Sequence, residues 1–293
     1  MRLMIFLPKI KIKPSRKADV EQFIYFLNHN FYIQKRIMIL NAFPDLDQSL
    51  TNDQQFVVVN KFVSLFYKQN AKKIEQIIQK DKKTINNKEV KMLSFLKKLM
   101  DANWSGKEVF YAIPTILPFS PFRGNSFYYS ILGKIRNNKI QKDVLFIAAH
   151  EISHFIFYDT LAEIKRNHSD IKLSKESEHY LKEALVPAVL NEKGINKLLK
   201  LHNYRGNSEL HHLQVKLGEE VSGFMEFISH YYHLQKIENK KYFNEVLFDL
   251  VKIFSDADDQ LILKKSIWDK YGFNMKSNSV AFNKYRKPIV LYL

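Results

Sequence analysis

The chain has 293 residues and a hydrophobic content of 46%, enough to bury a core in one two-lobed domain or in two small ones. It has no cysteine, which excludes disulfides and zinc ribbons and is typical of a cytoplasmic protein. Its formal net charge of +16 is compatible with nucleic acid as a partner, but the lysines are scattered and no recognised nucleic-acid-binding motif occurs. We expect a cytoplasmic protein without a membrane partner, because no segment is long and apolar enough to span a bilayer. The oligomeric state stays open.

The first 105 residues are expected to form a strand and a helical scaffold. Apolar residues alternating with lysines predict a strand over residues 1–13, which Pro14 ends. Apolar residues at helical spacing then predict four helices, the second of which starts at the capping-box pattern of Thr51 to Gln54; they cover residues 15–41, 51–66, 71–82 and 88–102. No catalytic signature occurs in them, so we expect them to provide scaffolding or substrate access.

Two strands are expected after this scaffold. Residues 108–117 and 126–132 are rich in β-branched and aromatic side chains, and the intervening loop contains proline and glycine. Arg123 and Asn125 in this loop are candidates for contact with a substrate.

The motif H-E-x-x-H occupies His150, Glu151 and His154 in an apolar stretch, residues 143–158, that predicts a buried helix. The two histidines are four residues apart, so both imidazoles lie on one helix face and can reach one metal ion. Glu151 points about 100° away, close enough to hold a water on that metal. Three ionisable groups in such a helix are costly unless they are paired or ligated, which favours a zinc site over satisfied core histidines.

A catalytic zinc needs a third protein ligand and an open position for water, and Glu183 is our choice for that ligand. It lies 29 positions after His154 (183 − 154) and opens the apolar run of a second predicted helix, residues 174–191. Pro187, four residues later, removes the hydrogen bond to the Glu183 carbonyl and predicts a kink that helps to aim the carboxylate. Glu192 and His179 are the next candidate ligands.

This ligand set predicts how water would be activated. Zinc held by His150, His154 and Glu183 lowers the pKa of a bound water, and Glu151 takes the proton as that water attacks a peptide carbonyl. Glu151 then passes the proton to the departing amine. Asp159 and Asn191 are the nearest candidates in sequence for orienting the imidazoles.

His150, Glu151 and His154, followed by a glutamate on its own helix, resemble the gluzincin group of zinc metallopeptidases. The resemblance covers residues 126–191 and implies a zincin-like α+β fold, mainly helical, with a small mixed sheet before the H-E-x-x-H helix and a helical C-terminal subdomain. A weaker resemblance is to compact antirepressor-type metallopeptidases. The chain departs from the pattern of thermolysin, the best-known gluzincin, in two ways. The gap between His154 and the glutamate is longer, and Pro187 replaces the aspartate that usually follows that glutamate by one turn.

The resemblance also implies further roles. The aminopeptidase signature G-x-M-E-N is absent, so an endopeptidase-like cleft acting on a peptide or protein is expected. In zincins, the strand before this helix commonly borders the cleft and pairs with extended substrate; an ordinary buried strand is the equally weighted alternative. Gluzincins use a histidine or tyrosine after the third ligand to stabilise the oxyanion, and the candidates here are Tyr204, His211 and His212.

The expected organisation is an N-terminal scaffold over residues 1–105, a sheet with the active-site helix over 106–160, and a helical lobe over 161–293. In the last region, helices are predicted over residues 219–234, 242–254 and 258–271, and a strand or docking tail over 288–293. His230 and His233 could form a second metal pair, but solvated or core histidines are the favoured interpretation. The open alternatives to a peptidase are a binding protein with a structural metal and a nucleic-acid-associated protein.

Overall fold

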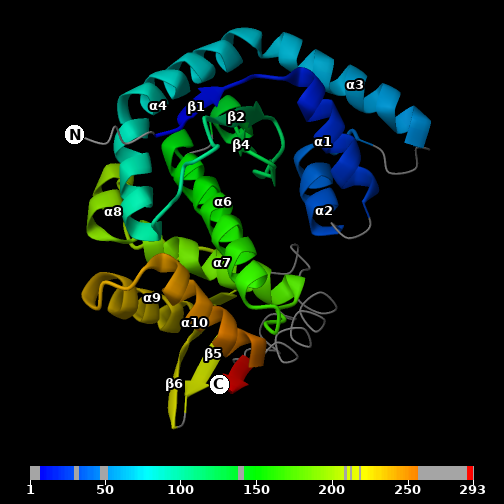
Figure 1. The fold of residues 1–293 in the computed structure, drawn as a ribbon. Helices are drawn as coiled ribbons and strands as arrows, with labels where there is room; N and C mark the ends of the chain where they lie inside the picture. The colour runs from blue at the N-terminus through cyan, green and yellow to red at the C-terminus, as the bar shows by residue number, and fades with distance from the viewer. Residues whose placement is uncertain are drawn as a thin grey trace. The chain divides into compact units, whose positions relative to one another are not determined.

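The structure is a computed structural model, and it describes residues 7–29, 33–46, 52–137, 142–207, 210–211, 213–217, 219–256 and 289–292. Within these residues the chain is mainly helical with two small sheets (Figure 1), which confirms the expected α+β class. It divides into two compact units, the first made of Met1–Lys91 and Trp104–Glu151 and the second of Met92–Asn103 and Ile152–Leu293. The three-part organisation expected from sequence stays a prediction. No helix in the described ranges has the length and apolar character needed to cross a membrane.

The first unit contains a mixed sheet with the strand order β1-β2-β4-β3. The strands are β1 (Lys9–Ile12), β2 (Val109–Thr115), β3 (Phe122–Arg123) and β4 (Ser126–Ser130). The pairs β1–β2 and β2–β4 are parallel, and β3 is antiparallel to β4. A small mixed sheet that precedes the H-E-x-x-H helix in the chain is therefore confirmed.

The side of β4 that faces away from β2 is covered by the chain segment before it, and a side chain contacts the backbone of β1. Beside β4, Tyr128 N donates to Pro121 O (2.7 Å) and Ser130 N to the Ser120 hydroxyl (3.3 Å), so residues 120–123 cover the edge that one of the two equally weighted interpretations gave to the substrate. On the other side of the sheet, Ile10 N in β1 donates to the Glu89 carboxylate (2.8 Å). Pairing of extended substrate with β4 is thus disfavoured, and the alternative of an ordinary buried strand fits better.

Four helices separate β1 from β2 in the chain, and their boundaries differ from the predictions. They are α1 (Arg16–Asn28), α2 (Ile33–Ala42), α3 (Asn52–Gln69) and α4 (Ala71–Met100). The single helix predicted over 15–41 is wrong, because His29 adopts an extended backbone (φ −84°, ψ 113°) that ends α1. Thr51, the start of the predicted capping box, lies outside the described residues.

The break predicted near residues 83–87 is also wrong, because α4 is one helix of 30 residues. The polar segment with two asparagines, Asn86 and Asn87, has low helix propensity. Ile85 in the same segment is fully buried and continues the apolar face that Ile78 and Met92 belong to. Burial of this face outweighs the local propensity.

A buried carboxylate joins α1, α3 and the end of β2. Asp19 is fully buried, and its Oδ2 accepts hydrogen bonds from the Tyr67 hydroxyl (2.7 Å) and from Ile116 N (3.1 Å). Burial raises the pKa of Asp19 from 3.8 to about 6, against the lowering effect of these hydrogen bonds. The folded state therefore binds this proton more tightly than the unfolded chain does.

This shift predicts that the contribution of Asp19 to the free energy of unfolding falls as pH rises from about 4 to about 6. Two pKa units correspond to about 3 kcal/mol. Chemical denaturation of the wild type and of Asp19→Asn should show their difference in unfolding free energy changing by up to that amount across this window. Asp45→Asn, at an exposed position, is the matched control for loss of one carboxylate. A difference between wild type and Asp19→Asn that stays constant with pH would contradict the shift.

The second unit is built on helices α7 (Lys175–Leu190), α8 (Lys193–Leu199), α9 (Phe224–Tyr232) and α10 (Phe243–Asp256), with a π-helical segment, His233–Glu238, after α9. It also contains a three-stranded sheet in the order β6-β5-β7, formed by Glu220–Gly223, Leu213–Leu217 and Ile289–Tyr292. The helix predicted over 219–234 is wrong at its start, where β6 pairs with β5. The C-terminal strand is confirmed, and the helix predicted over 258–271 lies outside the described residues.

Candidate metal centre

The motif lies on α6 (Val144–Asn167), which follows β4 and the short helix α5 (Leu132–Ile135) in the chain. Asp143 caps the start of α6, because its Oδ1 accepts a hydrogen bond from Leu145 N (2.7 Å). Residues 144–149 are all buried, so this turn of the helix is held by burial of its apolar side chains. The division between the two units falls inside α6, after Glu151, so the helix itself fixes His150 relative to His154.

Helix α7 begins at a capped N-terminus and runs antiparallel to the second half of α6. Ser174 is the N-cap residue, and its hydroxyl accepts a hydrogen bond from Ser177 N (3.1 Å). Three pairs join the two helices in reverse order: His154 with Glu183, Tyr158 with Lys182, and Lys165 with Glu178. This pairing brings Glu183 to His154 across the 29 intervening positions (183 − 154).

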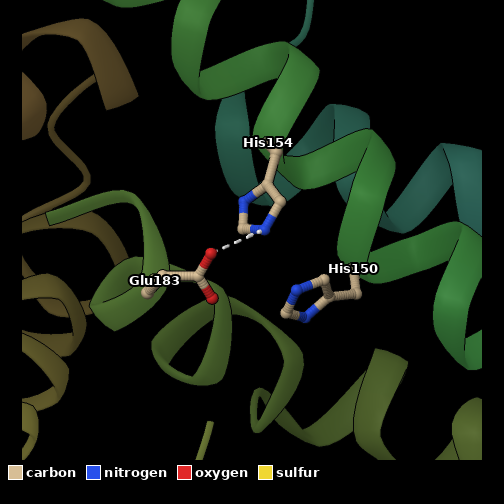
Figure 2. Close-up of side chains that lie close together, drawn as sticks. All are labelled: His150, His154 and Glu183. Atoms are coloured by element: carbon tan, nitrogen blue, oxygen red, sulfur yellow. Dashed lines mark ion pairs between the residues drawn. The ribbon is translucent and has the colours of Figure 1, made fainter. Parts of the chain in front are cut away.

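His150, His154 and Glu183 form a compact group. Each offers one ligand atom, and these atoms all lie within 4.8 Å of one another. Figure 2 shows both imidazoles directed toward the Glu183 carboxylate, with His154 Nε2 3.4 Å from Glu183 Oε1. Nitrogen or oxygen ligands about 2.0–2.2 Å from a tetrahedral zinc lie roughly 3.4 Å apart, so this pair already has the separation of two zinc ligands.

The donor types of this group also fit a catalytic rather than a structural zinc. Two histidines and one carboxylate are the three protein ligands of one common catalytic zinc class, which keeps a fourth position for water. Glu151, the residue after His150, is 5% exposed, and His154 is 1% exposed. A buried carboxylate next to a metal ligand is suited to accept a proton from water. In the part of the chain that the structure describes, no other group of three such residues could hold a metal ion.

A lysine and a histidine on α7 also lie close to the Glu183 carboxylate. Lys182 Nζ lies 3.0 Å from Glu183 Oε1, and His179 Nδ1 lies 4.0 Å from the same atom. His179, which with Glu192 is one of the next candidate ligands, lies beside the group without belonging to it. Lys182 is not among the site residues predicted from sequence, because an ammonium group is not a zinc ligand. Its signal in the sequence is a lysine placed between Leu181 and Glu183 in an apolar run.

The residues predicted for oxyanion stabilisation lie in the segment after α8. The Asn191 side chain donates to Tyr204 O (2.7 Å) and accepts from Tyr204 N (2.9 Å), so it fixes the backbone of Tyr204. His211 is exposed, with Nε2 2.8 Å from Arg205 O. His212 lies outside the described residues. These contacts do not test the oxyanion role of Tyr204 and His211, which stays a prediction.

Other candidates have partners of their own. Asn191 hydrogen-bonds Tyr204 rather than an imidazole, and Asp159 is exposed on α6. Glu192, an alternative ligand, lies 2.9 Å from His233 Nδ1, and the other nitrogen of His233 lies 3.6 Å from Glu238. His230 is exposed. In the first unit, Asn125 donates to Val109 O (3.2 Å), which gives it a structural contact at the start of β2.

Comparison with known proteins gives no relative for this chain. No family model matches it, and neither the curated proteins nor the solved structures contain a significant match.

Proposed function

We propose that the chain is a zinc-dependent peptidase, with His150, His154 and Glu183 as the metal ligands. The observation that supports this most directly is the convergence of three ligand atoms within 4.8 Å, with the buried Glu151 next to one of them. The same residue types in the same chain order resemble the gluzincin metallopeptidases. The proposal includes a zincin-like fold.

In this proposal each residue has a separate task. A zinc ion at the three ligands would polarise the peptide carbonyl and lower the pKa of a bound water. Glu151 accepts the proton of that water and returns it to the departing amine, because a buried carboxylate is a suitable general base and acid. The pairing of α6 with α7 keeps His154 and Glu183 in place, since an ion pair between Lys165 and Glu178 also joins the two helices.

The proposed substrate is a peptide or protein cut at an internal bond. Nucleic acid remains an alternative partner on the strength of the +16 charge alone, and no structural feature of the described residues adds to it. Binding to DNA or RNA that weakens steeply with salt would support that alternative.

Zinc analysis of the purified protein tests the proposal. We expect about one zinc per chain, measured by elemental analysis, and a large loss of zinc in Glu183→Ala, because two histidines alone leave the ion without its anionic ligand. Glu176→Ala, in the first turn of the same helix, is the matched control and should keep the zinc. A wild-type protein that takes up no zinc even after reconstitution would refute the proposal.

A further inference from the structure

Lys182 is an unusually placed lysine in the second unit. Its side chain is 5% exposed, and it lies on α7 directly before the proposed ligand Glu183. Lysine is among the residue types that are almost never fully buried unless they are paired, because removing the ammonium from water is costly. The position of Lys182 therefore needs a compensating anion.

One anion that compensates the charge of Lys182 is the carboxylate of Glu183, a member of the metal-binding group. Lys182 Nζ lies 3.0 Å from Glu183 Oε1, the same oxygen that lies 3.4 Å from His154 Nε2. The ammonium also lies 5.8 Å from the centre of the Tyr158 ring on α6, within the range of a cation–π contact. Because carboxylate oxygens bind zinc at about 2.0–2.2 Å, the ammonium would be within about 5 Å of a zinc held by that oxygen.

A metal ion changes the charge around Lys182. When a divalent cation binds the Glu183 carboxylate, the negative charge of Glu183 no longer balances the Lys182 ammonium fully, and the ion repels the ammonium. An additional negative charge near the metal would then be stabilised by both cations. Peptide hydrolysis produces such charges, first on the carbonyl oxygen under attack and then on the carboxylate of the product.

We propose that Lys182 is the anion-binding cation of this site, which neutralises Glu183 in the metal-free protein and stabilises the negatively charged oxygen of the reacting peptide when metal is bound. This inference rests on the proposed function and gives a specific residue to the oxyanion role. Lys182 Nζ has a defined contact with the carboxylate of a proposed ligand, Glu183.

The test uses protein loaded with Co²⁺, whose visible absorption reports both metal binding and binding of an anion to the metal. Acetate serves as the probe, because it carries the carboxylate of a peptide product. In Lys182→Met we expect acetate to bind at least tenfold more weakly, while Co²⁺ binds as tightly as in the wild type or up to tenfold more tightly. In the zinc enzyme, kcat should fall about 10²-fold, the size typical of losing one oxyanion donor.

Two further variants sharpen the comparison. Lys182→Arg keeps the charge and should retain more acetate affinity than Lys182→Met, whereas Lys175→Met removes an exposed lysine from the same helix and should match the wild type. If Lys182→Met loses Co²⁺ affinity, Lys182 acts by holding Glu183, and the anion-binding role is overturned. Unchanged acetate affinity in Lys182→Met also overturns it while leaving the peptidase proposal intact. A wild type that binds no metal overturns both.

Discussion

Glu151→Gln is expected to keep the metal and to lose peptide hydrolysis. The amide has nearly the size of the carboxylate, so the buried side chain, 5% exposed in the wild type, can be replaced with little change in packing. It cannot accept the proton of the attacking water, and loss of a general acid–base group typically lowers rates by about 10²–10⁴-fold. The variant should therefore contain about one zinc per chain and show a kcat reduced by at least 10²-fold.

The measurement is zinc content together with cleavage of a peptide library by purified protein. Glu163→Gln, an exposed glutamate on the same helix, is the matched control and should retain both zinc and activity. An active Glu151→Gln enzyme would show that another group moves the proton. Wild-type protein that holds zinc but cleaves no peptide would instead favour a binding protein with a structural metal, which should show four protein ligands and no exchangeable water.

His154→Ala is expected to abolish stoichiometric zinc binding. His154 is 1% exposed, and its Nε2 is 3.4 Å from Glu183 Oε1, so it is the ligand that joins α6 to α7 at the site. Without His154 only two protein ligands remain, His150 and Glu183, and two ligands cannot hold a catalytic zinc tightly. Zinc at 100 times its dissociation constant should stabilise the wild type by about 2.7 kcal/mol and should leave His154→Ala unaffected.

Thermal unfolding with and without added zinc measures this effect, and elemental analysis gives the stoichiometry. His202→Ala removes an exposed histidine and should behave as the wild type does. Circular dichroism of the metal-free proteins separates loss of the ligand from loss of the fold, because truncating a buried side chain also leaves a cavity. Retention of one zinc per chain in a folded His154→Ala protein would rule out this ligand set.

The predictions from sequence succeeded where local signals agree with burial. Helix α7 begins within one residue of the predicted start because Ser174 caps it, and Asp143 likewise caps α6. The strands β2 and β4 were located because β-branched and aromatic residues are bounded there by proline and glycine. The helix carrying the motif continues to Asn167, beyond the predicted end at residue 158, because Leu161 and Ile164 extend its buried face.

The predictions failed where tertiary contacts override local preference. The polar segment around Asn86 and Asn87 indicated a break, yet the buried Ile85 keeps α4 continuous. The amphipathic pattern over residues 219–234 predicts one helix, but residues 220–223 pair with β5 as β6. For β4 the sequence left substrate pairing and an ordinary buried strand equally weighted, and residues 120–123 cover the edge in question. The apolar pattern within one segment does not show which distant segment of the chain will pair with it.

For the site, the sequence by itself determined the relation of His150 to His154. Four residues on an α-helix always place two side chains on one face, so this geometry is local. It also indicated Glu183, because that acid opens an apolar helix. Only the tertiary structure decided that α7 lies antiparallel to α6, which brings the Glu183 carboxylate to 3.4 Å from His154. The same packing buries Lys182 beside that carboxylate. Contacts between separate helices depend on how their surfaces pack in the core, and no regular residue spacing in the sequence reveals them.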